Sequence, residues 1–323
     1  MPYTPSFIND AANNDAANNP VPNNNNDIDW QSLMHPDDRA AIDAMEKLPG
    51  FSTLMKWILT GVFEKSMYAE KISQNLRLGP NQLPEYYNLL VDVCNTLKIK
   101  EIPDFYLEMN PMPNACTFGE KRVFITMTSG LLELLSPDDV KTVLAHECGH
   151  ILFKHVRYSM VAQCIRRGLN TAVGNVATLA TFGLTEGFEQ IVYRWERMSE
   201  YSSDRVSAIF AGSAKRASQV IMGLAGGPKD IIKNVNYEEY CNQIRDHEAV
   251  FGQTGMEGLI SKSTLLNMDH PFNASRALEM QKFSKEQRFK NIVRQLGTYC
   301  CPKCGGRISP NSNSNICANG HFN

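Results

Sequence analysis

The segment from Ser136 to Val156, SPDDVKTVLAHECGHILFKHV, decides how this 323-residue chain is organised. It begins as helices commonly do, with serine at the N-cap, proline at the first helical position and two aspartates that complement the positive end of the helix dipole. Residues four apart in a helix project from the same face, one turn apart. We therefore expect a helix to about His155 that presents His146 and His150 on one side.

The pentapeptide HECGH at 146–150 has the HExxH pattern of zinc-dependent peptidases. Two imidazoles one turn apart can bind one Zn²⁺ ion, each about 2 Å from the metal. Glu147 points about 100° around the helix from His146, so its carboxylate can act as general base on a zinc-activated water. The pattern predicts an enzyme that hydrolyses peptide bonds.

A third zinc ligand has to come from another part of the chain. Phe153 and Val156 stand where the extended motif has glycine and a third histidine, which excludes that class. On a continuous helix His155 points about 140° away from His150. We interpret His155 as a C-terminal histidine favoured by the helix dipole.

A later helical stretch, Glu189–Ala211, offers carboxylates for that role. Glu200 can complete a set of two histidines and one glutamate, and it leaves the fourth position open for water. Asp204, on the same face, can accept the second ring N–H of a ligating histidine and so select its tautomer. Spacing alone leaves Glu196 as a rival ligand and a solvated acidic face as the alternative.

Four separated motifs are similar to those of a known family. They are Asn114-Ala115, HECGH at 146–150, Glu200 with Asp204-Arg205, and Asp269-His270-Pro271 followed by Arg276. The chain resembles the HtpX-like and CAAX prenyl protease group of zinc metallopeptidases, metallopeptidase family 48, of the gluzincin type. The resemblance extends over roughly residues 30–290.

This resemblance implies roles for single residues near the metal. It implies that Glu200, rather than Glu196, is the third zinc ligand. It also implies that Asp204 is the partner of a ligating histidine, and that Arg276 holds acidic groups close to the site. Many relatives carry spanning helices around the zinc helix, whereas this chain has only one weak candidate, described below.

The resemblance also implies how a substrate is bound. The strand over 114–118 would pair with an extended peptide, with Asn114 and Ala115 contacting its backbone, because an exposed edge strand offers free N–H and C=O groups. His270 would donate a hydrogen bond to the oxyanion formed at the attacked carbonyl. The alternative for His270 is a cap on a helix that starts near Pro271.

The stretches before the zinc helix predict the rest of the fold. Apolar residues at helical spacing favour helices over Asp37–Glu70, interrupted near Pro49-Gly50, and over Pro84–Leu97. Strand-like patterns occupy Asp104–Met109, Asn114–Phe118 and Arg122–Thr128. A hairpin turn is expected at Gly119-Glu120. We expect an α+β fold, mostly helical, with a small antiparallel sheet beside the zinc helix.

The last part of the chain predicts a small zinc-ribbon-like module. A CxxC pair followed by glycine lets two thiolates meet one metal, and three cysteines with one histidine form an acceptable structural zinc set. The candidate ligands are Cys301, Cys304, Cys317 and His321, with Cys300 as a spare. A second, structural Zn²⁺ would bind there; a loose tail and a redox CxxC are the alternatives.

The expected domains follow from composition. Residues 1–29 are rich in Asn, Ala, Asp and Pro and hold too few large apolar groups to order a segment, so we expect a disordered tail. Residues 30–295 form the metallopeptidase domain, and 296–323 the zinc-ribbon-like module. The sequence contains no pattern that determines the oligomeric state.

Charge and cysteine usage bound the partners and the compartment. With 32 basic and 34 acidic residues, the formal charge is −2, so no nucleic-acid partner is expected. The nine unevenly spaced cysteines and the lack of a leader favour a reducing, cytoplasmic location. The uncharged stretch 168–185 is the alternative, membrane-associated element, but its many small and polar residues disfavour a spanning helix.

The leading hypothesis is therefore a zinc-dependent metalloendopeptidase that acts on extended or unfolded polypeptide. A catalytically inactive, zinc-containing binding or adaptor protein is the alternative. Its signature would be loss of the glutamate between the histidines, and Glu147 is present. A zinc-ribbon nucleic-acid binder would need a basic face, which this composition does not supply.

Overall fold

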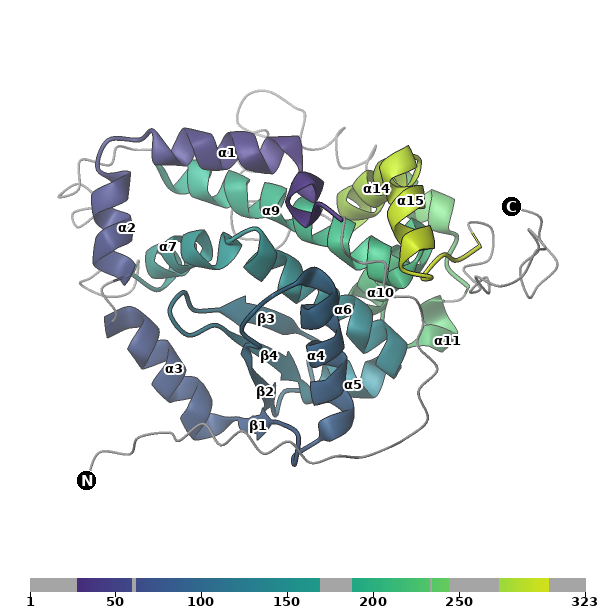
Figure 1. Cartoon of the computed structure of the whole chain (residues 1–323), viewed down its shortest axis with the longest axis horizontal. Coiled ribbons are helices and arrows are strands. Elements are labelled where there is room, and N and C mark those ends of the chain that lie inside the picture. The colour runs from purple at the N-terminus through teal and green to yellow at the C-terminus, as the bar shows by residue number, and fades with distance from the viewer. Residues whose placement is uncertain (1–27, 60–61, 169–187, 233, 244–272, 302–323) are drawn as a thin grey trace.

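The computed structural model describes residues 28–59, 62–168, 188–232, 234–243 and 273–301. Within these ranges helices dominate, and they surround one sheet of four strands (Figure 1). The helices are η2 (Trp30–Leu33), α1 (Pro36–Glu46), α2 (Phe51–Leu59), α3 (Val62–Gln74), α4 (Pro84–Leu97), α5 (Ser129–Leu134), α6 (Pro137–Leu152), α7 (His155–Gly168), α9 (Phe188–Ala211), α10 (Ala214–Gly226), α11 (Lys229–Ile232), α14 (Asn273–Ser284) and α15 (Gln287–Gln295). The strands are β1 (Leu76–Leu78), β2 (Asp104–Glu108), β3 (Ala115–Phe118) and β4 (Phe124–Thr128). The mostly helical α+β class is confirmed.

The sheet is mixed, so the prediction of a purely antiparallel sheet is wrong. Its strand order is β1-β2-β4-β3, and β2 pairs with β4 in parallel. The expected hairpin is present, because β3 and β4 pair antiparallel around a turn in which Gly119 has φ of 94°. The hairpin folds so that β4 lies next to β2, and β3 becomes an edge strand of the sheet. Sequence analysis did not identify β1, since three residues are too few to show an alternating pattern.

Each face of the sheet belongs to a different part of the core. Phe105 and Ile125 lie in a cluster with residues of α4, α6 and α9. Their neighbours Tyr106 and Phe124 lie in a second cluster, which contains Trp195 and residues of α2 and α7. Successive side chains of a strand point to opposite faces, so the central strands are covered by helices on both sides. At the edge of the sheet, β3 packs against α6.

Helix α6 starts as predicted but ends earlier than predicted. Ser136 is at the N-cap position, and its hydroxyl donates to Asp139 at 2.6 Å rather than accepting from a helix N–H. The helix ends at Leu152, because Lys154 adopts a left-handed conformation with φ of 60°. The chain turns there, and His155 begins α7. The expectation of a continuous helix to about His155 is wrong.

Helices α6 and α9 pack closely against each other at Gly149. A Cβ added to Gly149 would lie 3.0 Å from the Cα of Ser203 on α9. Glycine therefore lets the two backbones approach. The approach brings the part of α9 that carries Glu200 and Asp204 alongside HECGH.

Several predictions fall on residues outside those described. These are the tail over 1–27, most of the uncharged stretch 168–185, the segment with His270, and the chain beyond Cys301. Ile28 is buried in the main core and Asp29 caps η2, accepting from the N–H of Ser32. No helix within the described ranges is both long and apolar enough to cross a membrane.

Candidate active site

Three of the predicted metal ligands converge on one point between α6 and α9. The Nε2 atoms of His146 and His150 lie 3.2 Å apart. Glu200 places one carboxylate oxygen 3.4 Å from Nε2 of His146 and the other 3.4 Å from Nε2 of His150. Across the described ranges, these three residues form the group of His, Cys, Asp and Glu side chains that could hold a metal ion. Glu200 belongs to that group and its rival Glu196 does not.

These separations fit a tetrahedral metal ion. Ligand atoms about 2.0–2.1 Å from a metal in tetrahedral geometry lie about 3.3–3.4 Å from one another. Each histidine nitrogen is at such a distance from the other and from one oxygen of Glu200, and the donor set of two imidazoles and one carboxylate is a catalytic zinc set. The residues present therefore fit Zn²⁺.

His146 is oriented by a carboxylate and an arginine. Its Nδ1 lies 3.0 Å from Oδ1 of Asp204. Arg276 on α14 donates to both oxygens of Asp204, at 2.8 and 2.6 Å, and its Nη1 lies 3.2 Å from Glu200. Side chains of both charged partners are nearly inaccessible, at 2% exposure for Asp204 and 8% for Arg276. The structure thus brings Asp204 and Arg276, for which the resemblance implied supporting roles, against His146 and Glu200.

Charges in this cluster shift the pKa values of its members. Burial alone would raise the pKa of Asp204, but the charge and hydrogen bonds of Arg276 and the hydrogen bond with His146 outweigh burial and lower it. Burial lowers the pKa of His146, but the charge of Glu200 and the hydrogen bonds with Asp204 and Glu200 raise it to about 10. The pocket therefore favours positive charge where the metal would bind.

His150 is oriented by a histidine that the sequence analysis misinterpreted. The Nδ1 atoms of His150 and His155 lie 3.1 Å apart. Nε2 of His155 lies 2.8 Å from Oδ2 of Asp38, which is on α1. Because α6 ends before His155, the 140° argument does not apply, and the ring of His155 folds back onto that of His150. The interpretation of His155 as a dipole-stabilised helix end is wrong.

Glu147, the predicted general base, is held by a strand residue. The hydroxyl of Thr117 on β3 donates to Oε2 of Glu147 at 2.6 Å. Glu147 is 6% exposed and lines the same cavity as His146. Thr117 was not predicted as a site residue, because nothing in the sequence distinguishes it from other strand threonines.

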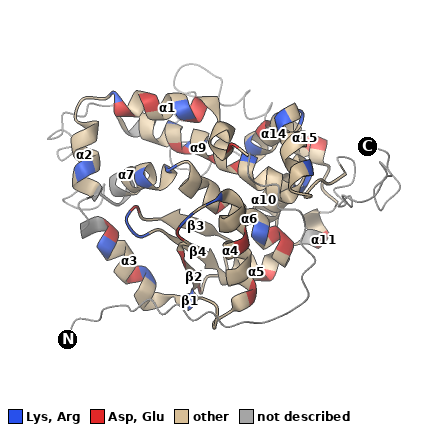
Figure 2. Cartoon of the chain, in the orientation of Figure 1, with Lys and Arg blue, Asp and Glu red and all other residues tan. Residues whose placement is uncertain are grey.

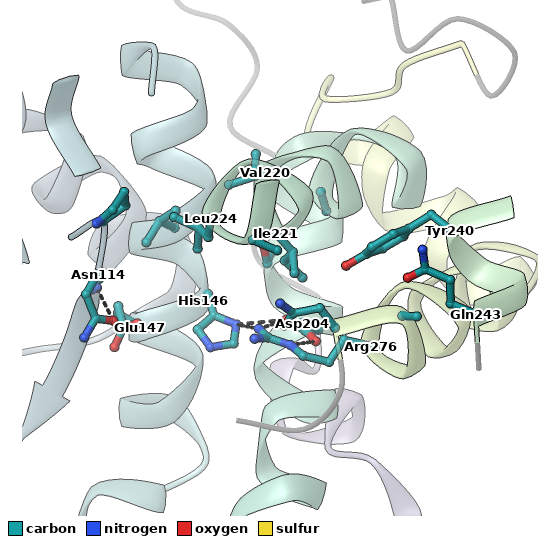
Figure 3. Close-up of a pocket in the computed structure, with 18 residues that line it drawn as sticks. Asn114, His146, Glu147, Asp204, Val220, Ile221, Leu224, Tyr240, Gln243 and Arg276 are labelled. Atoms are coloured by element: carbon teal, nitrogen blue, oxygen red, sulfur yellow. Dashed lines mark hydrogen bonds and ion pairs between the residues drawn. The ribbon is translucent and has the colours of Figure 1, made fainter. Parts of the chain in front are cut away.

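A cavity of about 540 Å³ opens beside His146 and Glu147 (Figure 3). Asn114 and Ala115 border it on the side of the sheet, and Arg276 borders it opposite. Tyr240 and Gln243 lie at the far end in Figure 3. One wall is apolar and consists mainly of α6 and α10 residues: Val143, Ala217, Val220, Ile221 and Leu224. Its volume is in the range of small-ligand pockets.

The edge strand β3 turns backbone groups toward this cavity. Thr128 on β4 donates its N–H to the carbonyl of Asn114 at 3.0 Å. Hydrogen-bonding directions alternate along a strand, so the N–H of Ala115 points away from β4. That N–H donates to the side-chain oxygen of Asn114 at 2.9 Å. The two residues predicted to contact substrate thus border the cavity.

The remaining predicted site residues are not brought into this site by the described part of the chain. His270, Cys304, Cys317 and His321 lie outside it. Cys301 is fully buried, and so is its neighbour Cys300, whose thiol donates to the carbonyl of Ala211 at 3.4 Å. Cys300 therefore lies against the end of α9.

Comparisons with known proteins agree with this geometry. A metallopeptidase of chloroplast plastoglobules, plastoglobule-localized metallopeptidase 48 from Arabidopsis thaliana, is 28% identical over 273 residues, which cover 83% of this chain and 77% of that protein. HtpX protease homologues from Tropheryma whipplei and Aeropyrum pernix are 30% and 31% identical, over 34% and 35% of this chain. These two matches span 37% and 43% of the relatives' own lengths.

A family comparison covers more of the domain than the matches to the HtpX homologues. The model of peptidase family M48 matches residues 89–284, which is more than half of the chain and includes both the HECGH helix and Glu200. The match confirms the resemblance drawn from the four motifs. On this evidence the chain belongs to peptidase family M48.

Proposed function

We propose that this chain is a zinc-dependent metalloendopeptidase that hydrolyses peptide bonds in extended or unfolded polypeptide. The observation that carries the proposal is the convergence of His146, His150 and Glu200: the two Nε2 atoms are 3.2 Å apart, and each lies 3.4 Å from one oxygen of the Glu200 carboxylate. Membership of a metallopeptidase family supports it. A purely structural cluster would have no need for the open cavity that adjoins these atoms.

Each residue has a distinct part in the proposed chemistry. When bound by His146, His150 and Glu200, zinc supplies Lewis acidity that activates water and polarises the scissile carbonyl. Glu147 accepts the proton of the attacking water and passes it to the leaving amine. The hydrogen bond from Thr117 holds one carboxylate oxygen of Glu147, which leaves the other for this exchange. His270 remains the proposed oxyanion donor.

The edge strand supports an extended substrate. A peptide that adds to β3 as a further strand would take the N–H of Ala115 from the Asn114 side chain, and Asn114 would then be available to bind the peptide backbone. Such pairing requires a chain segment without its own secondary structure. Unfolded segments and extended loops are therefore the proposed substrates.

The apolar wall supports a preference for one substrate side chain. Val220, Ile221 and Leu224 lie along this cavity in Figure 3, and Val143 also lines it. An apolar side chain adjacent to the scissile bond would lose its contact with water there, at a gain of about 25 cal/mol per Å². Elsewhere in the described part of the chain both signs of charge occur together, for example along α3 (Figure 2), so charge there does not favour a partner of one sign.

The test combines metal analysis with cleavage of casein. Glu147→Gln is expected to keep zinc and to lose cleavage at least about a hundredfold, since it removes the general base and no ligand. Glu200→Ala is expected to lose most of the zinc. Wild-type cleavage rates in Glu147→Gln would overturn the mechanism. Two zinc ions per wild-type chain would support the additional site proposed at Cys301, Cys304, Cys317 and His321, and one would count against it.

A further inference from the structure

His155 and Asp38 are buried polar residues that the proposed chemistry does not use. Both are completely buried, and they lie on α7 and α1, on the side of His150 away from Glu200. Asp38 also accepts from Trp195 at 3.1 Å through Oδ1 and from Ser202 at 2.5 Å through Oδ2. Burying a carboxylate and an imidazole is costly unless every contact is satisfied, so their placement beside a metal ligand calls for a physical account.

The hydrogen positions along these contacts follow from the contacts themselves. A metal-binding imidazole nitrogen carries no proton, so Nε2 of His150 is bare and its Nδ1 carries hydrogen. That N–H donates to Nδ1 of His155, 3.1 Å away. The proton of His155 then sits on Nε2 and is donated to Asp38, a carboxylate that can only accept. Every donor in the line meets an acceptor.

We propose that Asp38 and His155 form a relay that positions the ring of His150 and selects the tautomer whose Nε2 binds zinc. Both are positioning residues, because neither reaches the metal. The inference rests on the proposed zinc site and adds two residues to it. It also assigns the N-terminal helix α1 a role in the active site, although Asp38 precedes residues 89–284, which carry the family match.

The donors around Asp38 make the relay directional. Trp195 donates to Oδ1, so an asparagine at position 38 would place its carbonyl oxygen toward Trp195 and its amide NH₂ toward His155. The amide would donate where the carboxylate accepts. His155 would then carry its proton on Nδ1, and His150 would have to carry its own on Nε2, the atom that faces the metal. Asp38→Asn therefore reverses the relay with almost no change in volume.

The first measurement is zinc affinity, determined by competition with a chelator of known strength. Asp38→Asn is expected to bind zinc about 10–100-fold more weakly than wild type, the usual effect of losing the partner of a metal-bound histidine. The matched control is Asp139→Asn, an equally isosteric change of another buried carboxylate, on α6 itself and 5% exposed. It is expected to stay within about twofold of wild type, because the Asp139 carboxylate lies near Ser136 and Arg216, at the opposite end of α6 from His150.

The second measurement does not depend on zinc. Nitrogen-15 NMR of histidine-labelled, metal-free protein at pH 8 is expected to show His150 protonated on Nδ1 and His155 on Nε2, and to show both reversed in Asp38→Asn. The seven histidines of the chain make assignment by single substitution practicable. The amide of His155→Gln can both donate to Asp38 and accept from His150. This variant is therefore expected to keep most of the wild-type zinc affinity.

The two measurements separate the relay from the zinc site. The relay would be overturned if Asp38→Asn bound zinc as tightly as wild type. It would also be overturned if His150 of the wild-type protein carried its proton on Nε2. If Glu200→Ala kept its zinc, the proposed metal site itself would be wrong. A fall in affinity with unchanged tautomers would also overturn the relay, because the loss would then come from general loosening.

Discussion

The two histidines of HECGH sit one turn apart on α6, yet the protein holds them in different ways. His146 contacts the carboxylate of Asp204 directly, and Arg276 donates two hydrogen bonds to that carboxylate. His150 reaches its carboxylate, Asp38, through the ring of His155. The direct support comes from α9 and α14, and the indirect one from α7 and α1. Two proposed metal ligands one helical turn apart thus depend on different parts of the fold.

The difference lies in how charge is balanced. Around His146, an arginine and two carboxylates form a compact charged cluster. Around His150, uncharged donors from Trp195 and Ser202 surround Asp38. Burial alone would raise the pKa of Asp38, but its interactions with His155 and the hydrogen bond of Ser202 lower it. Both carboxylates are therefore ionised at neutral pH, and each holds a ring N–H in place.

Breaking both supports at once is expected to have the largest effect. If they act independently, the losses of zinc affinity in Asp38→Asn and Asp204→Asn multiply, to about 10²–10⁴-fold in the double variant. Chelator competition on the two single variants and the double variant measures the coupling. If the double variant bound zinc as tightly as the single variant with the lower affinity, the two supports would act as one unit.

Breaking the direct support alone is expected to cost stability as well as zinc. Asp204→Asn leaves the buried guanidinium of Arg276 without its paired carboxylate, and removing one partner of a buried ion pair costs about 3–5 kcal/mol. Asp38→Asn leaves no buried arginine without its carboxylate partner, so we expect it to be less destabilised than Asp204→Asn. Urea denaturation of the metal-free proteins makes the comparison, and equal losses would contradict it.

The pH dependence of this loss has a defined sign. The pKa of Asp204 is lowered in the folded protein, whereas an unfolded aspartate has a pKa of about 3.9. The stabilisation is therefore complete above about pH 4 and disappears as pH falls through the lower, folded value. The stability gap between wild type and Asp204→Asn should therefore shrink as pH falls below about 4.

A change that touches neither support is expected to leave zinc affinity unchanged. Thr117→Val removes the hydroxyl that holds Glu147 and keeps the shape of the side chain. We expect kcat to fall about tenfold because the general base is misoriented, with KM and zinc content unchanged. Thr117→Ser should recover the rate, and zinc loss in the valine variant would show that β3 also supports the metal ligands.

The smallest effect is expected at the close contact between α6 and α9. Gly149→Ala would place a Cβ 3.0 Å from the Ser203 backbone and press α9 away from α6. Overpacking costs about 1–3 kcal/mol, and the better helix propensity of alanine returns about 1 kcal/mol. We expect a net loss of about 1 kcal/mol in thermal denaturation. Unchanged stability would show that α9 can move without cost.

Local patterns of the sequence predicted most of the site's components. The HECGH helix, the α9 stretch with Glu200 and Asp204, and the β3–β4 hairpin all follow from periodicity, capping residues or turn residues. Glu200 was separated from Glu196 by family resemblance, since spacing alone left both open. In the structure Glu200 is the one that joins the two histidines. What these elements contact was not predictable from the same patterns.

The sequence by itself determined the chemistry of this protein: which side chains can hold zinc, which can take a proton, and that they lie on helices beside a small sheet. Only the tertiary structure decided the parallel pairing of β2 with β4, the hydrogen bond from Thr117 to Glu147, and the proposed relay from Asp38 through His155 to His150. The turn at Lys154 shows why. A left-handed lysine costs about 1–2 kcal/mol and has no local signal in its favour. The conformation is compensated by contacts between residues 117 positions apart, Asp38 and His155. Local patterns report the preferences of neighbouring residues, and such contacts form only when the chain has folded.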